Sequence, residues 1–360
     1  MDTLTNRGQA QPGDFAVWGL DAQKALYREL AVDALRLWGL DAARRLSWLT
    51  YSTNAVFAVR TAEARYVLRL SLPPGRVKAT RLRSELDWLR AIRQRTELLA
   101  PNPVSLQTGG GARLFGSVSH GSLPPPHSAY CVLFEHLVGR TKSASELGTA
   151  DCFQIGSYLG SLHQDAQFEP PADFDRPRLD QPGLFGAESP YESDEESRAL
   201  EAGQREASAR VAGRVGQAMA RIDCQRDSFG LIHADLLAKN VLFAGDTIAA
   251  LDFEYCGWGY FLYDLAPLLW QLRGERSADY AQLESALLAG YQSTRADAAV
   301  DREALEAFIA ARQLASCRWL LQHRHHPQVR ELAPALIRQR TAELLHFLSS
   351  GVLERQSPTL

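Results

Sequence analysis

The hydrophobic pattern of the chain changes near residue 137, and this change most constrains how the chain can fold. Before it, short β-prone runs alternate with turn signals, and one charged helical segment lies among them at about 79–98. After it, apolar residues recur mainly at helical spacing as far as Ser350, and a polar tail follows. We therefore expect an α+β fold with two lobes: a small antiparallel sheet in residues 1–137 and a larger, mainly helical lobe in residues 138–360.

Turn residues divide the strand-rich part into segments. The β-prone runs 46–60 and 65–72 are joined by a polar Thr-Ala-Glu-Ala sequence, which predicts one pair of antiparallel strands. Three glycines at 109–111 lie between two further strand-like runs. No Gly-Lys-Ser/Thr follows these glycines, so they predict a hairpin turn rather than a phosphate-binding loop.

Length and charge narrow the possible classes of protein. The 360 residues suit two domains, or one fold with two lobes, at about 150 residues per domain. The 39 Lys and Arg are balanced by 42 Asp and Glu, so the basic excess of a nucleic-acid-binding protein is missing and we expect no nucleic-acid partner.

Five cysteines without a C-x-x-C pair predict neither a disulfide framework nor a zinc site. We see no secretory signal and no apolar run of membrane-spanning length, so we expect a cytoplasmic protein without membrane contact. The oligomeric state stays open.

One region of the helical part is rich in side chains that can do chemistry. Residues 231–266 contain acidic, amide and imidazole groups framed by apolar runs. The six are His233, Asp235, Asn240, Asp252, Glu254 and Asp264.

The spacing of these groups suits phosphoryl transfer. Asp235 and Asn240 lie between two apolar strand-like runs, where sites are commonly built. Asp252 and Glu254 alternate with apolar neighbours, so an extended chain would place both carboxylates on one face. A hairpin that brings Asn240 near Asp252 would gather oxygen ligands of the kind that Mg²⁺ prefers. Asp235 would then be available to accept a hydrogen bond from a substrate hydroxyl, and phosphoryl transfer needs little beyond these parts and a phosphate clamp. Taken singly, each acid could equally be an ordinary turn or cap residue.

The motif H-x-D-x-x-x-x-N, followed twelve residues later by the aspartate of L-D-F-E, resembles the catalytic and metal-binding loops of a known superfamily. This is the aminoglycoside phosphotransferase and choline kinase superfamily, the phosphotransferase enzyme family. The Tyr-Asp-Leu-Ala at 263–266 is similar as well, and the resemblance implies that Asp264 anchors the catalytic loop through its backbone. The resemblance extends over most of the chain and implies a bilobal protein-kinase-like fold with ATP and Mg²⁺ as cofactors.

The same resemblance implies roles for the other members of the motif. Asp235 is expected to be the catalytic base or the carboxylate that orients the acceptor hydroxyl. Asn240 and Asp252 are expected to hold Mg²⁺, and Glu254 is expected to help directly or through water. His233 is expected to brace the loop by hydrogen bonding rather than to exchange protons.

Weaker matches in the first lobe concern the nucleotide. Asn54 lies in a run that resembles the hairpin covering the nucleotide, and Arg69 stands where the family places a phosphate-contacting cation. Glu85, on the following helix, matches the family's acidic partner for that cation. Backbone groups near Glu135 and Leu137 are expected to bind the adenine edge. Arg69 replaces the usual Lys, which keeps the charge but changes the geometry of the contact.

The acceptor is less well constrained. Acidic residues at 188–201 could form a rim that attracts a cationic amine, or they could simply face water at a helix N-terminus. Our first hypothesis is an ATP-dependent kinase of a small-molecule hydroxyl. The acceptor would be an amino alcohol, a homoserine-like or hydroxylysine-like hydroxy amino acid, or an aminoglycoside-like amino sugar. The second is a protein Ser/Thr kinase of the bacterial stress-response type, which the run 312–324 faintly resembles. The third is a nucleotide-binding pseudokinase that acts as an interaction module, against which the intact motif argues.

Overall fold

The computed structural model divides the chain into two compact units. The first comprises residues 1–79, 103–136 and 325–328, and the rest of the chain forms the second. The described residues are 15, 18–40, 45–71, 78–109, 111–123, 127–164, 168–186, 189–191, 198–222, 227–298 and 300–359.

The division differs from the expected one in its details. One boundary falls beside residue 137, but residues 80–102 group with the second unit. These residues include most of helix α2 (Ala79–Arg95). Burial explains this placement, because the Trp88 ring of α2 packs edge-on against Phe253 at 5.4 Å between centroids.

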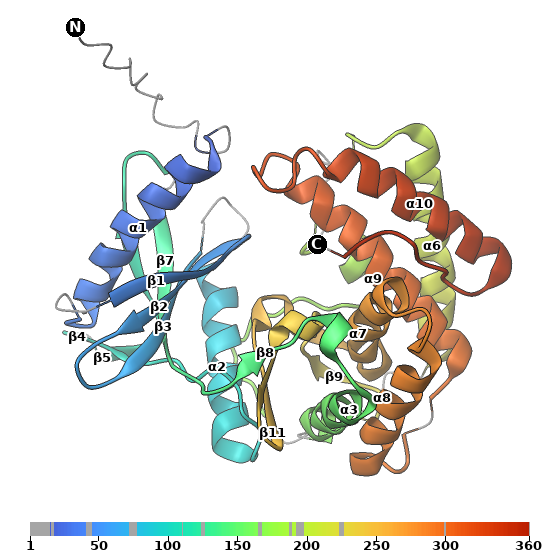
Figure 1. Cartoon of the computed structure of the whole chain (residues 1–360), viewed down its shortest axis with the longest axis horizontal. Helices are drawn as coiled ribbons and strands as arrows, with labels where there is room; N and C mark the ends of the chain where they lie inside the picture. Colours follow the sequence, from blue (N-terminus) through green and yellow to red (C-terminus); the bar gives the residue numbers. More distant parts are fainter. Residues whose placement is uncertain are drawn as a thin grey trace, which may run out of the picture. The chain divides into compact units, whose positions relative to one another are not determined.

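The first unit contains a five-stranded antiparallel sheet with the order β1-β2-β3-β7-β6 (Figure 1). Its strands are β1 (Arg45–Tyr51), β2 (Asn54–Arg60), β3 (Arg65–Ser71), β6 (Gly116–Ser119) and β7 (Ser128–Glu135).

The expectation of a single strand over 46–60 is wrong. The run contains two strands, β1 and β2, which pair with each other so that Tyr51 lies opposite Ala55. Ser52 and Thr53 lie between them where the chain reverses, and Ser52 N donates a hydrogen bond to Asn54 O at 3.1 Å. The hairpin expected at the three glycines is present: β4 (Leu106–Thr108) pairs with β5 (Gly111–Arg113).

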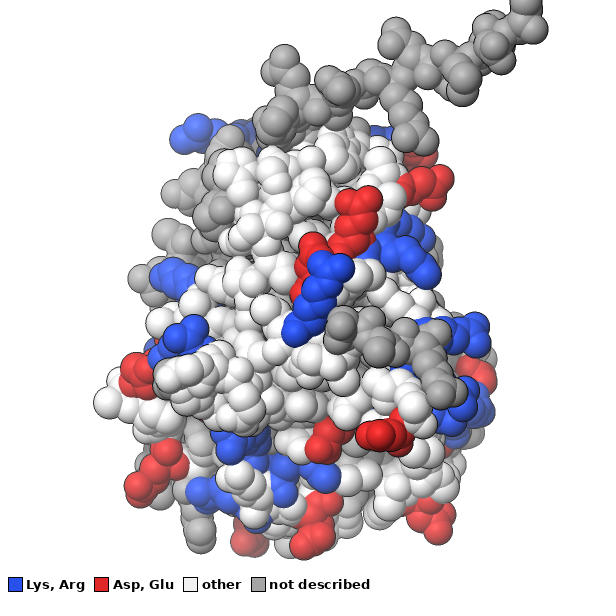
Figure 2. All heavy atoms as spheres, turned by 90° about the vertical axis from the view of Figure 1, so that its left-hand side faces the viewer, with Lys and Arg blue, Asp and Glu red and all other residues white. Residues whose placement is uncertain are grey.

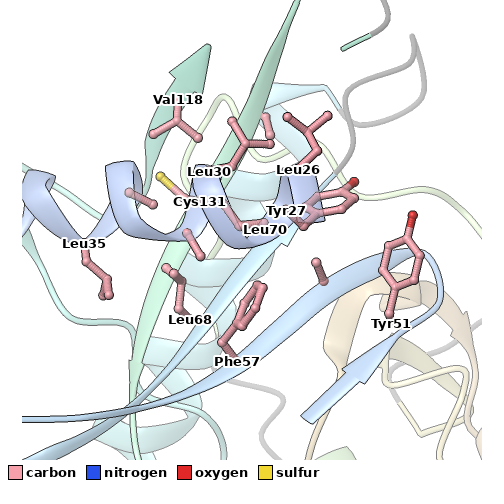
Figure 3. Packing of buried hydrophobic residues seen from close by; sticks show 14 of the residues in the cluster. Leu26, Tyr27, Leu30, Leu35, Tyr51, Phe57, Leu68, Leu70, Val118 and Cys131 are labelled. Carbon is pink, nitrogen blue, oxygen red and sulfur yellow. The ribbon is translucent and has the colours of Figure 1, made fainter. Parts of the chain in front are cut away.

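Helix α1 (Leu20–Leu37) and the sheet share one hydrophobic core (Figure 3). Leu26 and Leu30, one helical turn apart, are both buried on the same side of α1. On the sheet, Leu68 and Leu70 alternate along β3 in the same way, with Phe57 of β2 beside them. The helical periodicity of α1 and the strand periodicity of β3 therefore place apolar side chains in the same core.

Figure 2 shows one face of the molecule, on which the described acidic and basic side chains are interspersed.

The second unit is mainly helical, and two small groups of strands carry its polar loops. β9 (Phe229–Ile232) pairs with β12 (Gly257–Tyr260), and β10 (Val241–Ala244) lies between β11 (Thr247–Ala250) and β8 (Arg140–Thr141). Its longer helices beyond α2 are α3 (Thr149–Gln164), α6 (Ala202–Arg221), α7 (Phe261–Glu275), α8 (Tyr280–Thr294), α9 (Arg302–Gln322) and α10 (Ala333–Ser350). None of the described helices is long and apolar enough to cross a membrane.

Glycines allow two of these helices to approach unusually closely. A Cβ at Gly156 of α3 would lie 2.0 Å from Leu287 O of α8, and one at Gly290 of α8 would lie 2.0 Å from Phe153 O of α3. Only residues without a side chain fit at these two crossing points. The close packing brings the end of α3, with His163, against Tyr291 of α8.

The C-terminal segment is not the polar tail that its composition indicates. Leu353, Arg355 and Ser357 are buried in the second unit. The guanidinium of Arg355 lies over the Trp270 ring of α7, 3.7 Å from its centroid.

Candidate active site

The loop after β9 is held by a single buried carboxylate. Ala234 has a left-handed backbone, with φ of 68°, so that the amides of His233 and Ala234 point in one direction. Asp264, in the first turn of α7, accepts both: His233 N donates to Oδ2 at 2.9 Å and Ala234 N to Oδ1 at 2.6 Å. The left-handed backbone at Ala234 thus places two amides where one carboxylate can accept hydrogen bonds from both.

Asp264 has a third partner, His163, which sequence reasoning missed. His163 Nε2 lies 3.0 Å from Asp264 Oδ2, and Nδ1 lies 3.1 Å from the Tyr291 hydroxyl. Burial lowers the pKa of His163, although Asp264 acts in the opposite direction. Burial alone would raise the pKa of Asp264, but the hydrogen bonds from His163 and from the His233 amide lower it. The pair is therefore a neutral imidazole that donates to an anionic carboxylate.

His233 makes its contacts to the backbone. Its Nε2 donates to Leu251 O at 2.8 Å, and Asp235 N donates to its Nδ1 at 3.3 Å. The ring is fully buried and packs against Phe253, with 4.5 Å between centroids. With both nitrogens occupied, this imidazole joins the loop after β9 to the segment after β11.

Asp235 and Asn240 form a closed turn. Asp235 O accepts hydrogen bonds from Leu237 N and from Asn240 Nδ2, both at 2.9 Å. Asn240 O accepts from Leu251 N at 2.8 Å, which places residue 240 beside the segment that carries Asp252. Because Nδ2 of Asn240 is engaged, Oδ1 is the side-chain atom left for a ligand.

The expectation that Asp252 and Glu254 lie on one face of an extended strand is wrong. Asp252 is left-handed, with φ of 63°, and residues Phe253–Tyr255 form a short 3-10 helix. The Phe253 ring fills the space between His233 and Trp88, which turns the chain inward at this point. Arg176 fixes the turn by donating to Glu254 O at 2.5 Å and to Cys256 O at 2.7 Å.

Arg312 of α9 forms an ion pair with Asp235, a contact that sequence reasoning also missed. Its Nη2 lies 2.6 Å from Asp235 Oδ1, and the two side chains are 9% and 17% exposed. The guanidinium lies over the Trp270 ring, 5.0 Å from its centroid. Burial would lower the pKa of Arg312, but the charge of Asp235 and nearby phenolic oxygens raise it. A permanent cation therefore stands beside the carboxylate that the motif singles out.

Tyrosines lie around this ion pair. The rings of Tyr191 and Tyr255 stack at 5.2 Å with an interplanar angle of 8°, and Tyr263 is fully buried. Burial raises the pKa of all three hydroxyls, that of Tyr263 to about 12. The tyrosines therefore keep their protons and bring neutral hydrogen-bonding groups to the site.

The residues expected to bind the nucleotide are divided between the two units. Asn54 and Arg69 are buried on the neighbouring strands β2 and β3 of the first unit, and Glu135 ends β7 of the same sheet. Glu85, on α2, and Leu137 belong to the second unit. The pairing of Arg69 with Glu85 stays a prediction.

Five of the six acidic residues expected to matter at 188–201 lie outside the described residues. The sixth, Glu201, is the N-cap of α6 and forms a capping box with Gln204. This acid serves the helix end.

Comparisons with known proteins agree with the motif. The model of the phosphotransferase enzyme family matches residues 51–298. The chain belongs to this family. The predicted α+β kinase-like fold and the predicted enzyme class, a kinase-like phosphotransferase, are confirmed.

Individual known proteins are similar to this chain over about nine-tenths of its length. Homoserine kinase of Gluconobacter oxydans (strain 621H) is 29% identical over 346 residues, which cover 91% of this chain and 99% of the relative. The structure of a microcompartment-associated aminopropanol kinase superposes with a TM-score of 0.72 at 25% identity, and covers 89% of this chain and 98% of that one. The structure of an amicoumacin kinase in complex with AMP-PNP and Ca²⁺, 19% identical, has a TM-score of 0.70 over 93% of this chain and 97% of its own.

Proposed function

We propose that the protein transfers the γ-phosphate of ATP, with Mg²⁺, to the hydroxyl of a small amine-bearing acceptor, an amino alcohol or a hydroxy amino acid. The observation that carries this proposal is the fixed position of Asp235. Its backbone oxygen accepts from Asn240, its carboxylate pairs with Arg312, and residue 240 is bonded to the segment that carries Asp252. The relatives named above support the acceptor class, because homoserine and aminopropanol both carry an amine and a hydroxyl.

Asp235 orients the acceptor hydroxyl in this proposal. Its backbone is held at the amide by His233 and at the carbonyl by Asn240, and Arg312 fixes Oδ1. Holding a hydroxyl in line with a phosphate is a large part of what a phosphotransferase must do, because the reaction itself needs little covalent help. A residue whose backbone is held at two points and whose carboxylate is held at one oxygen is suited to that task.

The residues near Asp235 fit a Mg²⁺ ion. Among the described residues, no three His, Cys, Asp or Glu side chains gather as a metal site. Asn240 Oδ1 and the exposed carboxylate of Asp252, with Glu254 directly or through water, make a sparser set of oxygen donors. Such a set suits a metal that takes its remaining ligands from phosphates and water. The bound ion would neutralise the charge of the phosphates.

The first unit supplies nucleotide contacts in this proposal. Arg69 provides the cation for the phosphates and is shielded by the Phe134 ring, 5.4 Å away. Asn54 begins the strand beside it, and Glu135 with Leu137 marks the segment whose backbone binds adenine. Glu85 keeps its expected role as the acid that supports the cation.

A screen with γ-labelled ATP tests the proposal. Wild-type protein is incubated with amino alcohols, hydroxy amino acids, aminoglycosides and protein substrates, with Mg²⁺ or with EDTA. We expect label on small amine-bearing alcohols, and only with Mg²⁺. Label on proteins alone would support a protein kinase instead, and nucleotide binding without transfer to any acceptor would support a pseudokinase.

A further inference from the structure

Arg312 has more hydrogen-bonding capacity than its ion pair uses. A guanidinium carries five N–H groups, and Asp235 engages only Nη2. Among the described residues nothing bonds Nη1, and this atom, unlike Nε, is not shielded from solvent. The side chain as a whole is only 9% exposed. This largely buried cation beside Asp235 therefore keeps N–H donors that the described residues do not use.

The Trp270 ring holds the Arg312 guanidinium in position. The guanidinium lies over this ring, whose Nε1 donates to Gln313 Oε1 at 3.0 Å. The guanidinium groups of Arg340 and Arg355 lie over the same ring at 5.2 and 3.7 Å. Three cations on one indole hold its plane in place, so Arg312 can turn little.

Asp235 and Arg312 can each bind a different part of the same acceptor molecule. Arg312 occupies Oδ1 of Asp235, while Oδ2 makes no hydrogen bond among the described residues. Oδ2 can accept the acceptor hydroxyl, and Nη1 of Arg312 then faces a neighbouring part of the same molecule. A guanidinium edge in a poorly hydrated place favours an anionic oxygen pair above other partners.

We propose that Arg312 binds a carboxylate of the acceptor, so that the preferred acceptor is a short hydroxy amino acid rather than an amino alcohol. This inference rests on the proposed function and specifies its substrate class. The neighbouring tyrosines Tyr191, Tyr255 and Tyr263 bring no negative charge that would compete for the guanidinium. Arg312 also positions Asp235 through the ion pair, so a test must separate recognition from positioning.

A pair of matched acceptors makes this separation. L-homoserine and 3-aminopropan-1-ol share the hydroxyl, the amine and the chain between them, and differ by the carboxylate alone. For wild type we expect kcat/KM to favour homoserine by about 10- to 100-fold, the value of a hydrogen bond to a charged group. In Arg312→Gln and Arg312→Lys this preference should shrink by about tenfold or more, mainly through KM for homoserine.

Positioning alone gives a different result. If Arg312 only orients Asp235, both acceptors lose the same factor in kcat, the preference stays, and the inference is overturned. Arg302→Lys is the control, because Arg302 lies on the same helix, α9, but is exposed and pairs with Glu284 at 2.8 Å. Its preference for homoserine should equal that of wild type.

Wild-type protein alone also tests the inference, should the Arg312 variants not fold. 2-Aminobutyrate keeps the carboxylate and amine of homoserine, and propylamine keeps only the amine. We expect 2-aminobutyrate to be the stronger competitive inhibitor, and equal inhibition would overturn the inference. If wild type phosphorylates both acceptors equally well, this inference fails and the proposed function stands. If it phosphorylates neither and labels only proteins, the proposed function fails first.

Discussion

Replacing Asp264 by Asn should both destabilise the second unit and displace the Asp235 loop. The carboxylate accepts three hydrogen bonds, from His233 N, Ala234 N and His163 Nε2, in a place with no solvent exposure. An Asn side chain can accept from Ala234 N through its remaining oxygen. Its NH₂ group would stand where Oδ2 now accepts two donors.

The magnitude follows from these contacts. Hydrogen bonds to a charged group contribute about 1.5 to 3 kcal/mol each. His163 can recover one bond by changing tautomer, whereas the His233 amide has no alternative acceptor in the described contacts. We therefore expect Asp264→Asn to lower the free energy of unfolding by about 2 to 4 kcal/mol.

Chemical denaturation followed by circular dichroism measures this loss as a shift of the midpoint at unchanged slope. Asp301→Asn is the matched control, because Asp301 also accepts two backbone amides, Glu303 N and Ala304 N, but at the exposed start of α9. Asn is as good an N-cap as Asp, so the control should change stability by less than about 0.5 kcal/mol. Equal midpoints for Asp264→Asn and wild type would refute the view that this carboxylate holds the loop.

Three further perturbations test other parts of the structure. Because burial lowers the pKa of His163, the unfolded chain binds a proton below about pH 6.5 that the folded protein resists. The free energy of unfolding should therefore fall as the pH drops below that value, and in His163→Gln it should fall less steeply, as denaturation at several pH values will show. Gly156→Ala would place a Cβ 2.0 Å from Leu287 O and should cost about 1 to 3 kcal/mol, whereas Gly213→Ala, with no atom within 4 Å, should be neutral or stabilising in the same melt. Asp252→Asn should raise the Mg²⁺ concentration for half-maximal transfer by about 10- to 100-fold in a titration at saturating ATP, and an unchanged titration would exclude Asp252 as a ligand.

Local sequence patterns predicted those features of the fold that depend on residues adjacent in the chain. The change from strand to helix periodicity near residue 137 and the hairpin at the three glycines follow from such patterns. The split of 46–60 into β1 and β2 was missed because only two residues, Ser52 and Thr53, interrupt an otherwise continuous β-prone run.

Contacts distant in sequence account for the other misses. His163 lies 101 residues from Asp264, and Arg312 lies 77 residues from Asp235, so neither partner has a local signal. The turn at Asp252 depends on the packing of the Phe253 ring against both His233 and Trp88. Packing against α2 overrides the alternation that favoured a strand there. Polar residues that complete the site are thus found only when the helices are placed around it.

The most direct test of the central claim is the transfer of γ-phosphate from Mg·ATP to L-homoserine by wild type and by Asp235→Asn, with AMP-PNP affinity measured in parallel. The claim is that Asp235 orients the acceptor hydroxyl and takes no part in holding the nucleotide. We predict that kcat falls by about 100-fold or more in the variant while AMP-PNP affinity is unchanged. A variant that transfers phosphate at the wild-type rate would contradict the claim.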